Sequence, residues 1–273
     1  MISHTMPRLL AATVSVVIGL SSVGCAGTKP GHPPPQSATP KPDSTSTTPG
    51  VSANPPVASG VSNGKDYTVT MKPIDGTTPD GAGRWHALAG QLSGGDPAVA
   101  EAFNKSSEAS AHQQVDQASS DADGVRGWSF ELKSALTFRP TAIGEVLSGA
   151  SYTKGAAHPT NYVSTVVIDS RTAHPITLGD LFTEEQSGLD RLSEQTKQTW
   201  PKVYGPGGDG APMPDEPGNR PLPQNYANWI PTAAGLELHF ADGQFGHGLP
   251  VITVPWSALA DLLAPDMKAL AQG

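Results

Sequence analysis

Histidines beside predicted turns are the residues of this chain best suited to chemistry. His158 and His174 each precede a proline, which favours extended or turn backbone. His239 and His247 flank a predicted hairpin, so these two imidazoles could approach one another across it. Two histidines are fewer ligands than a zinc site needs, and no HExxH motif is present. We therefore expect no metal site and no cofactor, and we interpret the histidines as surface side chains.

Motifs for nucleophilic or acid–base catalysis are also absent. The stretches around Ser93 and Ser148 lack the GxSxG pattern of a nucleophile elbow. Glu184 and Glu185 fit the first turn of a helix, where the helix dipole favours acids, better than a glycosidase pair. The sequence thus predicts no catalytic residue. A Ser/His/Asp triad assembled from distant segments is still compatible with it, so a cell-wall serine esterase is the alternative function.

The segment Gly246-His247-Gly248-Leu249-Pro250, which follows Phe245, is the most distinctive local stretch. Glycines allow a backbone to approach a partner closely. We predict ligand binding at exposed strand edges and at two loops, 155–162 and 243–250. A purely structural hairpin is the simpler interpretation of the second loop, and core positions are the simpler interpretation of Trp229 and Trp256. The candidate binding residues are His158, Tyr226, Trp229, His239, Phe245 and His247.

Residues 1–24 have the features of a signal peptide, with translation beginning at Met1 or Met6. Arg8 is the one firm charge of this segment and precedes the apolar or small run Leu9–Leu20. That run of about 12 residues is too short for a transmembrane helix and is typical of a signal-peptide core. The sequence therefore predicts an exported protein.

The only cysteine, Cys25, comes directly after Ser22-Val23-Gly24. This placement resembles the lipobox of bacterial lipoproteins, in which a small residue precedes a cysteine that becomes diacylated. Leucine usually stands where this chain has Ser22. The resemblance implies a protein anchored at the outer face of the plasma membrane, with the membrane as a partner through the lipid on Cys25. A diacyl anchor holds a protein on a membrane where one acyl chain would not.

Composition indicates the domain organisation. The 273 residues include 27 prolines and 30 glycines, and they carry 17 basic against 25 acidic side chains. The net charge of −8 argues against a nucleic-acid partner, which requires a basic surface. Residues 25–65, which begin with the lipidated Cys25 and are rich in Pro, Ser and Thr, are predicted to be a disordered tether. The block 205–224 is predicted to be a long loop within one domain, 66–273, rather than a boundary between two domains.

Hydrophobic periodicity predicts an α+β domain, mostly antiparallel sheet with about three helices. Alternating apolar residues indicate strands at 66–71, 85–92, 128–138, 143–152, 162–169, 236–240 and 251–254. Asp96-Pro97 has the form of an N-cap followed by proline and predicts a helix that ends near residue 116. Thr183 to Gln186 fits a capping box for a helix that ends near Trp200, and a closing helix is predicted over Trp256–Leu270.

Motifs in the second half of the chain match a known family in order and spacing. They are Gly155-Ala156-Ala157-His158-Pro159, Val166-Val167-Ile168-Asp169 and Pro175 to Phe182, with further matches at 225–229 and 251–259. The pattern resembles the C-terminal domain of RsiV-type extracytoplasmic proteins, a domain of unknown function shared with a mycobacterial secreted immunogenic antigen. The resemblance extends over residues 66–264 and implies an α/β unit with β-grasp-like elements.

The family also suggests what the domain does. RsiV itself is a membrane anti-sigma factor whose outer domain binds lysozyme. This chain has at most eight residues before its signal core, so we expect no sigma-binding domain and no anti-sigma activity. Ligand binding by the outer domain is the part of the analogy that applies. The predicted function is non-catalytic binding of a protein or a cell-wall glycan at the outer face of the plasma membrane.

Overall fold

The computed structural model describes residues 59–122, 125–205 and 216–272. These residues form an α+β unit with a six-stranded and a three-stranded sheet, and the predicted fold class is confirmed. The signal peptide, Cys25 and the tether as far as residue 58 lie outside the described residues. Their predicted roles therefore stay predictions.

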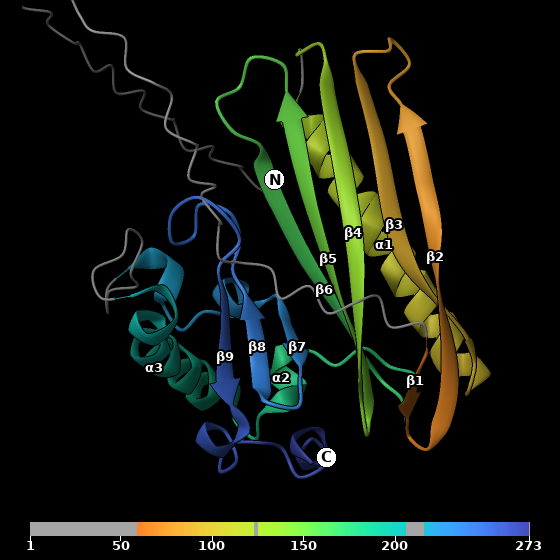
Figure 1. Cartoon of the computed structure of the whole chain (residues 1–273). Coiled ribbons are helices and arrows are strands. Elements are labelled where there is room, and N and C mark those ends of the chain that lie inside the picture. The colour runs from red at the N-terminus through yellow and green to blue at the C-terminus, as the bar shows by residue number, and fades with distance from the viewer. Residues whose placement is uncertain (1–58, 123–124, 206–215, 273) are drawn as a thin grey trace, which may run out of the picture. The chain divides into compact units, whose positions relative to one another are not determined.

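The larger sheet is built from consecutive strands. Its members, in both sequence and spatial order, are β1 (Ser59–Ser62), β2 (Lys65–Thr77), β3 (Gly83–Gly94), β4 (Trp128–Arg139), β5 (Ala142–Thr153) and β6 (Thr160–Asp169) (Figure 1). Neighbouring strands are antiparallel except β3 and β4. That pair is parallel because α1 (Pro97–Asp121) carries the chain back along the sheet between them.

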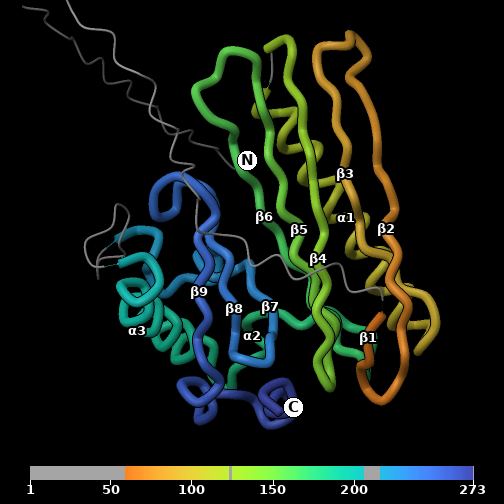
Figure 2. Tube along the Cα trace, viewed as in Figure 1, coloured from red at the N-terminus to blue at the C-terminus, as the bar shows by residue number. Residues whose placement is uncertain are grey.

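Helix α1 covers one face of the larger sheet (Figure 2). It begins as predicted, because the side chain of Asp96 accepts a hydrogen bond from a main-chain N–H of the first turn and Pro97 occupies that turn. It ends at Asp121, beyond the predicted end near residue 116. Its apolar side pairs with alternating strand residues to form the first core, whose largest buried members include Tyr67, Phe103, Phe130, Leu132, Ile143 and Leu147.

The smaller sheet packs against the opposite face of β5 and β6. It contains β7 (Trp229–Pro231), β8 (Gly235–His239) and β9 (Val251–Pro255), all antiparallel, and it is accompanied by α2 (Leu178–Leu181) and α3 (Glu185–Tyr204). Gly144 of β5 approaches Ile230 of β7, whereas the neighbouring Ile143 faces α1. The second core lies between the two sheets and α3, and its buried aromatic residues are Phe182, Trp200, Tyr226, Trp229, Phe240, Phe245 and Trp256.

The first described strand, β1, starts at Ser59, ahead of the predicted boundary at residue 66. Ser59–Ser62 pairs with β2 across an Asn63-Gly64 turn, in which both residues have positive φ (50° and 67°). Asn-Gly is favoured in such two-residue hairpin turns. The hydroxyl of Ser62 is buried and donates to the carbonyl of Arg139 at 2.7 Å. The last residues assigned to the tether therefore belong to the sheet.

The predicted closing helix over 256–270 is wrong. Two separate 3-10 turns, η3 (Trp256–Ala258) and η4 (Lys268–Ala271), occupy this region. Pro265 lies between them, and a proline has no N–H and clashes with the preceding helical turn. Leu259 and Leu263 are nevertheless buried.

Two further details differ from the expectations. The predicted loop 205–224 includes regular structure at its described end, because η1 (Pro217–Asn219) and η2 (Pro223–Tyr226) pack onto α3 and Asn219 is fully buried beside Ser193. Helix α3 is capped by Glu184 and not by Thr183, since the Glu184 carboxylate accepts hydrogen bonds from two N–H groups of the first turn. A negative side chain at a helix start also interacts favourably with the dipole.

The buried carboxyl group of Glu145 lies where β3 separates from β4 in the larger sheet. β3 pairs with β4 only as far as Ala87, although it stays paired with β2 to Gly94. Beyond that point the N–H of Gly90 donates to Oε1 of Glu145 at 2.8 Å, and the amide of Asn104 on α1 binds both main-chain groups of Leu92. Glu145 is fully buried within the first core. Side chains thus replace the missing strand as hydrogen-bond partners of β3.

Candidate functional site

The two loops that the sequence predicts to bind a ligand lie next to each other. The β5–β6 connection carries His158, the β8–β9 connection carries His247, and the centroids of the two imidazole rings are 4.1 Å apart. His239, the expected neighbour of His247, instead pairs with Glu237 on its own strand, with Nε2 and Oε1 2.9 Å apart. The fold therefore brings His247 to His158.

Asp242 connects these two loops. Its Oδ2 accepts hydrogen bonds from the main-chain N–H and the side-chain amide of Asn161, both at 2.9 Å, and its Oδ1 accepts from the N–H of Gly248 at 2.7 Å. Burial alone would raise the pKa of Asp242, but these donors and the adjacent His247 hold the pKa below its ordinary value. An ionised Asp242 therefore ties the β8–β9 connection to the start of β6.

Both imidazoles have Nδ1 close to an oxygen atom of the protein. Nδ1 of His247 lies 3.1 Å from Oδ1 of Asp242, and Nδ1 of His158 lies 3.1 Å from the carbonyl oxygen of Pro159. The carbonyl of Pro159 only accepts hydrogen bonds, so Nδ1 of His158 carries the proton when its ring is neutral, whereas His247 and Asp242 are within ion-pair distance. Neither Nε2 has a hydrogen-bond partner among the described residues. The two Nε2 atoms are thus available to a ligand.

Asp242 and Asn161 are site residues that the sequence does not reveal. Asp242-Gly243 has the form of a turn, and a turn is all that the sequence indicates there. The partner of Asp242 lies 81 positions away in the sequence, and no local pattern marks such a contact. The glycine-rich stretch after Asp242 is the one signal that points to this loop.

Three of the predicted binding residues lie in the second core instead. Tyr226, Trp229 and Phe245 are at most 4% exposed. Phe245 packs in an edge-on arrangement against Trp200 and Phe240, and its burial anchors the glycine-rich loop. Burial of these large apolar rings stabilises the fold, so they do not offer a surface to a ligand. His239 is also largely enclosed, with its side chain 11% exposed.

A cavity of about 520 Å³ lies beside β6, on the face that carries the smaller sheet. Its walls include Thr165 and Val167 of β6, Ile176 and Leu178 of the following segment, and Trp229 at the start of β7. Glu185 is the charged residue in this lining, and its side chain is exposed. The lining mixes apolar side chains with the polar residues Thr165, Thr177 and Gln224 and the one acidic residue Glu185.

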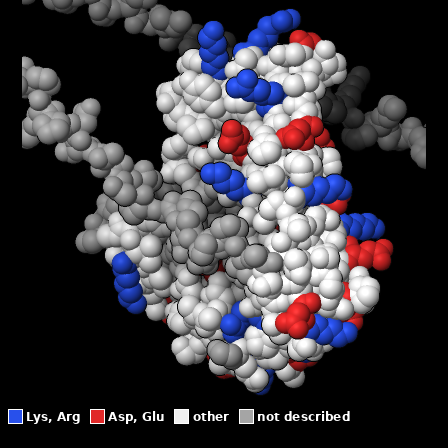
Figure 3. Space-filling model, turned by 45° about the vertical axis from the view of Figure 1, so that its right-hand side comes forward, with Lys and Arg blue, Asp and Glu red and all other residues white. Residues whose placement is uncertain are grey.

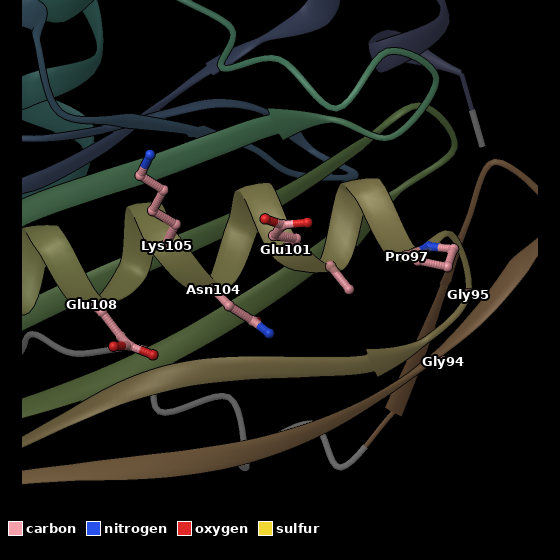
Figure 4. Close-up of a pocket in the computed structure, with 8 residues that line it drawn as sticks. Gly94, Gly95, Pro97, Glu101, Asn104, Lys105 and Glu108 are labelled. Atoms are coloured by element: carbon pink, nitrogen blue, oxygen red, sulfur yellow. The ribbon is translucent and has the colours of Figure 1, made fainter.

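A larger hollow of about 700 Å³ lies at the start of α1 (Figure 4). Asn104 and Glu108 point toward β3 in this view, whereas Glu101 and Lys105 project to the other side of the helix. The side-chain amide of Asn104 is hydrogen-bonded to the N–H and the carbonyl of Leu92, and the carboxylate of Glu108 is paired with Lys72 and Gln91. The polar groups on the β3 side are thus satisfied within the protein, so we assign no function to this hollow.

The described residues carry no arrangement typical of a metal or hydrolase centre. Within 59–122, 125–205 and 216–272, no three His, Cys, Asp or Glu side chains could together hold a metal ion. The histidine hydrogen bonds and ion-pair contacts found there run to carboxylates or to a carbonyl rather than to a serine hydroxyl. Figure 3 shows basic and acidic side chains interspersed over the visible face. Among the described helices, none has the length and apolar character needed to cross a bilayer.

These features define a two-sheet α+β domain with a loop-borne surface site. Its fold is similar to that of a DUF3298 family member from Bacteroides fragilis, with a TM-score of 0.50 and 13% sequence identity over 77% of this chain and 98% of that one. A DUF3298 family protein from Pseudomonas aeruginosa has a TM-score of 0.49 and 14% identity over 73% of this chain and 95% of that one. No protein-family model and no curated protein matches the sequence. At these identities the likeness concerns the fold.

Proposed function

We propose that this chain is a non-catalytic binding protein of the bacterial envelope, held at the outer face of the plasma membrane by a lipid on Cys25. Its ligand, an envelope protein or cell-wall component, binds at the paired loops 155–162 and 243–250. The resemblance of its motifs to the RsiV-type outer domain supports a binding role, since that domain binds a ligand in RsiV. The Cys25 context and the preceding apolar run support export and lipidation.

The observation that carries the binding proposal is the convergence of the two loops through Asp242. His158 and His247 lie side by side although their loops belong to two different sheets. The partly buried carboxylate of Asp242 holds the two loops together. Groups fixed in advance lose less conformational entropy when a ligand binds. The side chain of His247 is 49% exposed, so it is accessible to a ligand in solution.

The anchoring part of the proposal predicts the result of a single substitution. Cys25→Ala removes the thiol that would take the lipid, and we expect the protein to move from the membrane fraction to the soluble fraction. The reason is that the rest of the mature chain is acidic and gains no attraction to anionic lipids. Cell fractionation followed by immunoblotting measures the distribution. Retention of the variant in the membrane fraction would contradict lipid anchoring.

The binding part is tested with the soluble chain that begins at residue 26, which contains every described element. We expect this chain to co-sediment with isolated cell envelopes and the double variant His158→Ala/His247→Ala to bind about 10-fold more weakly. Loss of two hydrogen bonds of about 0.5–1.5 kcal/mol each accounts for a change of that order. The matched control is His86→Ala/His112→Ala, which removes two exposed histidines elsewhere. Equal binding by the two double variants would overturn the proposed site.

A further inference from the structure

Strand β6 is an edge of the larger sheet, and part of that edge is open. In an antiparallel strand, alternate residues direct both main-chain groups away from the neighbouring strand. Three contacts show that these are the odd-numbered residues of β6. The N–H of Asn161 bonds to Asp242, the carbonyl of Val167 accepts from Ile176, and the N–H of Asp169 bonds to the carbonyl of His174. Val163 and Thr165 therefore also direct their N–H and C=O groups outward.

The outward groups of Val163 and Thr165 have no hydrogen-bond partner among the described residues. Strand β7 does not cover them, because the N–H of Trp229 bonds to the side-chain hydroxyl of Thr165 on the face of the strand. The open stretch is bounded by Asp242 at one end and by Ile176 at the other. Unpaired strand edges of this kind are templates for another extended chain.

The cavity beside β6 gives this edge a preference for particular side chains. Thr165 and Val167 belong both to the outward-directed set and to the cavity lining. A strand added along β6 would direct every second side chain to the same face and toward this cavity. The apolar part of the lining, which includes Val167, Ile176 and Leu178, suits a long aliphatic stem, and the exposed Glu185 suits a positive charge at the end of that stem.

We propose that β6 binds an extended peptide segment of a partner protein by strand addition along Val163 and Thr165, with a lysine or arginine of that segment in the cavity next to Glu185. This inference rests on the proposed function, because it names the class of ligand that the site takes. A glycan lacks the regular alternation of amide donors and acceptors that the edge presents, so a peptide is the better complement. The ligand would end beside the loops that carry His158 and His247.

The first experiment selects peptides from a phage-displayed library of random 12-residue sequences against the chain that begins at residue 26. We expect enriched peptides to alternate apolar and polar residues and to contain lysine or arginine at a fixed position. Synthetic copies are then N-methylated at each backbone amide in turn and measured by fluorescence anisotropy. Methylation of the amides that face β6 is expected to weaken binding about 10-fold, and methylation of the alternate amides to change it less than about 2-fold. A uniform effect along the peptide, or no enrichment, would overturn the proposal.

Variants of the protein give a second, independent test. Val163→Pro removes an outward N–H and should weaken binding of a selected peptide about 10-fold, whereas the matched control Val163→Thr keeps the N–H and should leave binding within about 2-fold. Glu185→Lys should weaken binding of basic peptides about 5-fold through charge repulsion. Equal affinity of the proline and threonine variants, both folded by circular dichroism, would contradict strand addition. So would a concentration-dependent dimer that Val163→Pro abolishes, because a second copy would then occupy the edge.

The outcomes separate this inference from the proposed function. If envelope binding depends on His158 and His247 but Val163→Pro leaves the affinity for the peptide unchanged, the strand-addition proposal is wrong and the paired-loop site is supported. If peptides bind along β6 but substitution of both histidines leaves envelope binding unchanged, the proposed paired-loop site is wrong and the strand-addition proposal is supported.

Discussion

Glu145→Gln is expected to make the stability of the folded chain markedly less dependent on pH between about pH 4 and 8. Glu145 is fully buried in the first core, where it accepts hydrogen bonds from the N–H of Gly90 and the hydroxyls of Ser107 and Ser134. Burial raises the pKa of its carboxyl group, and those hydrogen bonds offset only part of the increase. Glutamine has nearly the same shape and no charge, so it isolates the effect of ionisation.

The sign follows from proton uptake. A carboxyl group whose pKa is higher in the folded state binds more protons when folded, so the free energy of unfolding falls as pH rises above the unfolded pKa of about 4.3. The loss is about 1.4 kcal/mol for each pH unit until the folded pKa is reached. Above that value the group is ionised in both states and its contribution is constant. The wild type should therefore lose stability over this window relative to the glutamine variant.

Urea denaturation at a series of pH values measures this difference. All other titrating groups are shared by the two proteins, so the quantity of interest is the difference between their free energies of unfolding. Glu131→Gln, which alters an exposed glutamate on β4, is the control and should show no such trend. A constant difference between wild type and Glu145→Gln from pH 4 to 8 would show that Glu145 has no raised pKa.

Arg139→Ala is expected to lower the free energy of unfolding by about 2–3 kcal/mol. The residue is 8% exposed, and its guanidinium donates to the carbonyl of Leu270 at 3.2 Å and to the carbonyl of Gln272 at 2.6 Å. Burial lowers the pKa of Arg139, but a guanidinium stays charged at neutral pH. The buried cation is thus satisfied by main-chain carbonyls and holds the C-terminal segment against the end of β4. Its removal should release Leu270 from the second core.

Thermal unfolding followed by circular dichroism measures this effect. For a folded unit of this size we expect the midpoint to fall by about 4–12 °C, since each kcal/mol corresponds to about 2–4 °C. Arg84→Ala, at an exposed position on β3, should leave the midpoint nearly unchanged. An Arg139→Ala midpoint equal to that of wild type would mean that the C-terminal segment is held by its apolar contacts alone.

Elements with strong local signals were predictable from the sequence, and elements decided by distant contacts were not. Asp96-Pro97 marks the start of α1 correctly because capping depends on neighbouring residues. The hairpin at Asn63-Gly64 escaped prediction because Ser59–Ser62 has almost no apolar character and resembles the tether before it. The region after Trp256 has the apolar spacing of a helix. It does not form one, because Leu263 forms an isolated β-bridge with Phe182 and Pro265 interrupts the helical hydrogen bonding.

The candidate site was predictable at the level of loops but not of partners. Glycine-rich sequence and the family-like motif around His158 pointed to loops 155–162 and 243–250. Which histidines meet depends on how the smaller sheet lies against β5 and β6, and no short sequence window contains that information. The roles of the aromatic candidates were even less predictable from the sequence, because an amphipathic ring such as that of Trp229 suits both a core and a binding surface. Burial places it in the core, where it also lines the cavity beside β6.

Hydrogen–deuterium exchange of the chain that begins at residue 26, with and without isolated envelopes, tests the central claim most directly. Residues that contact the ligand exchange more slowly when it is bound. We expect slower exchange in 155–162 and 243–250 and unchanged exchange around the hollow at the start of α1. Protection confined to α1 or other distant segments, or no protection anywhere, would contradict a binding site at the paired loops.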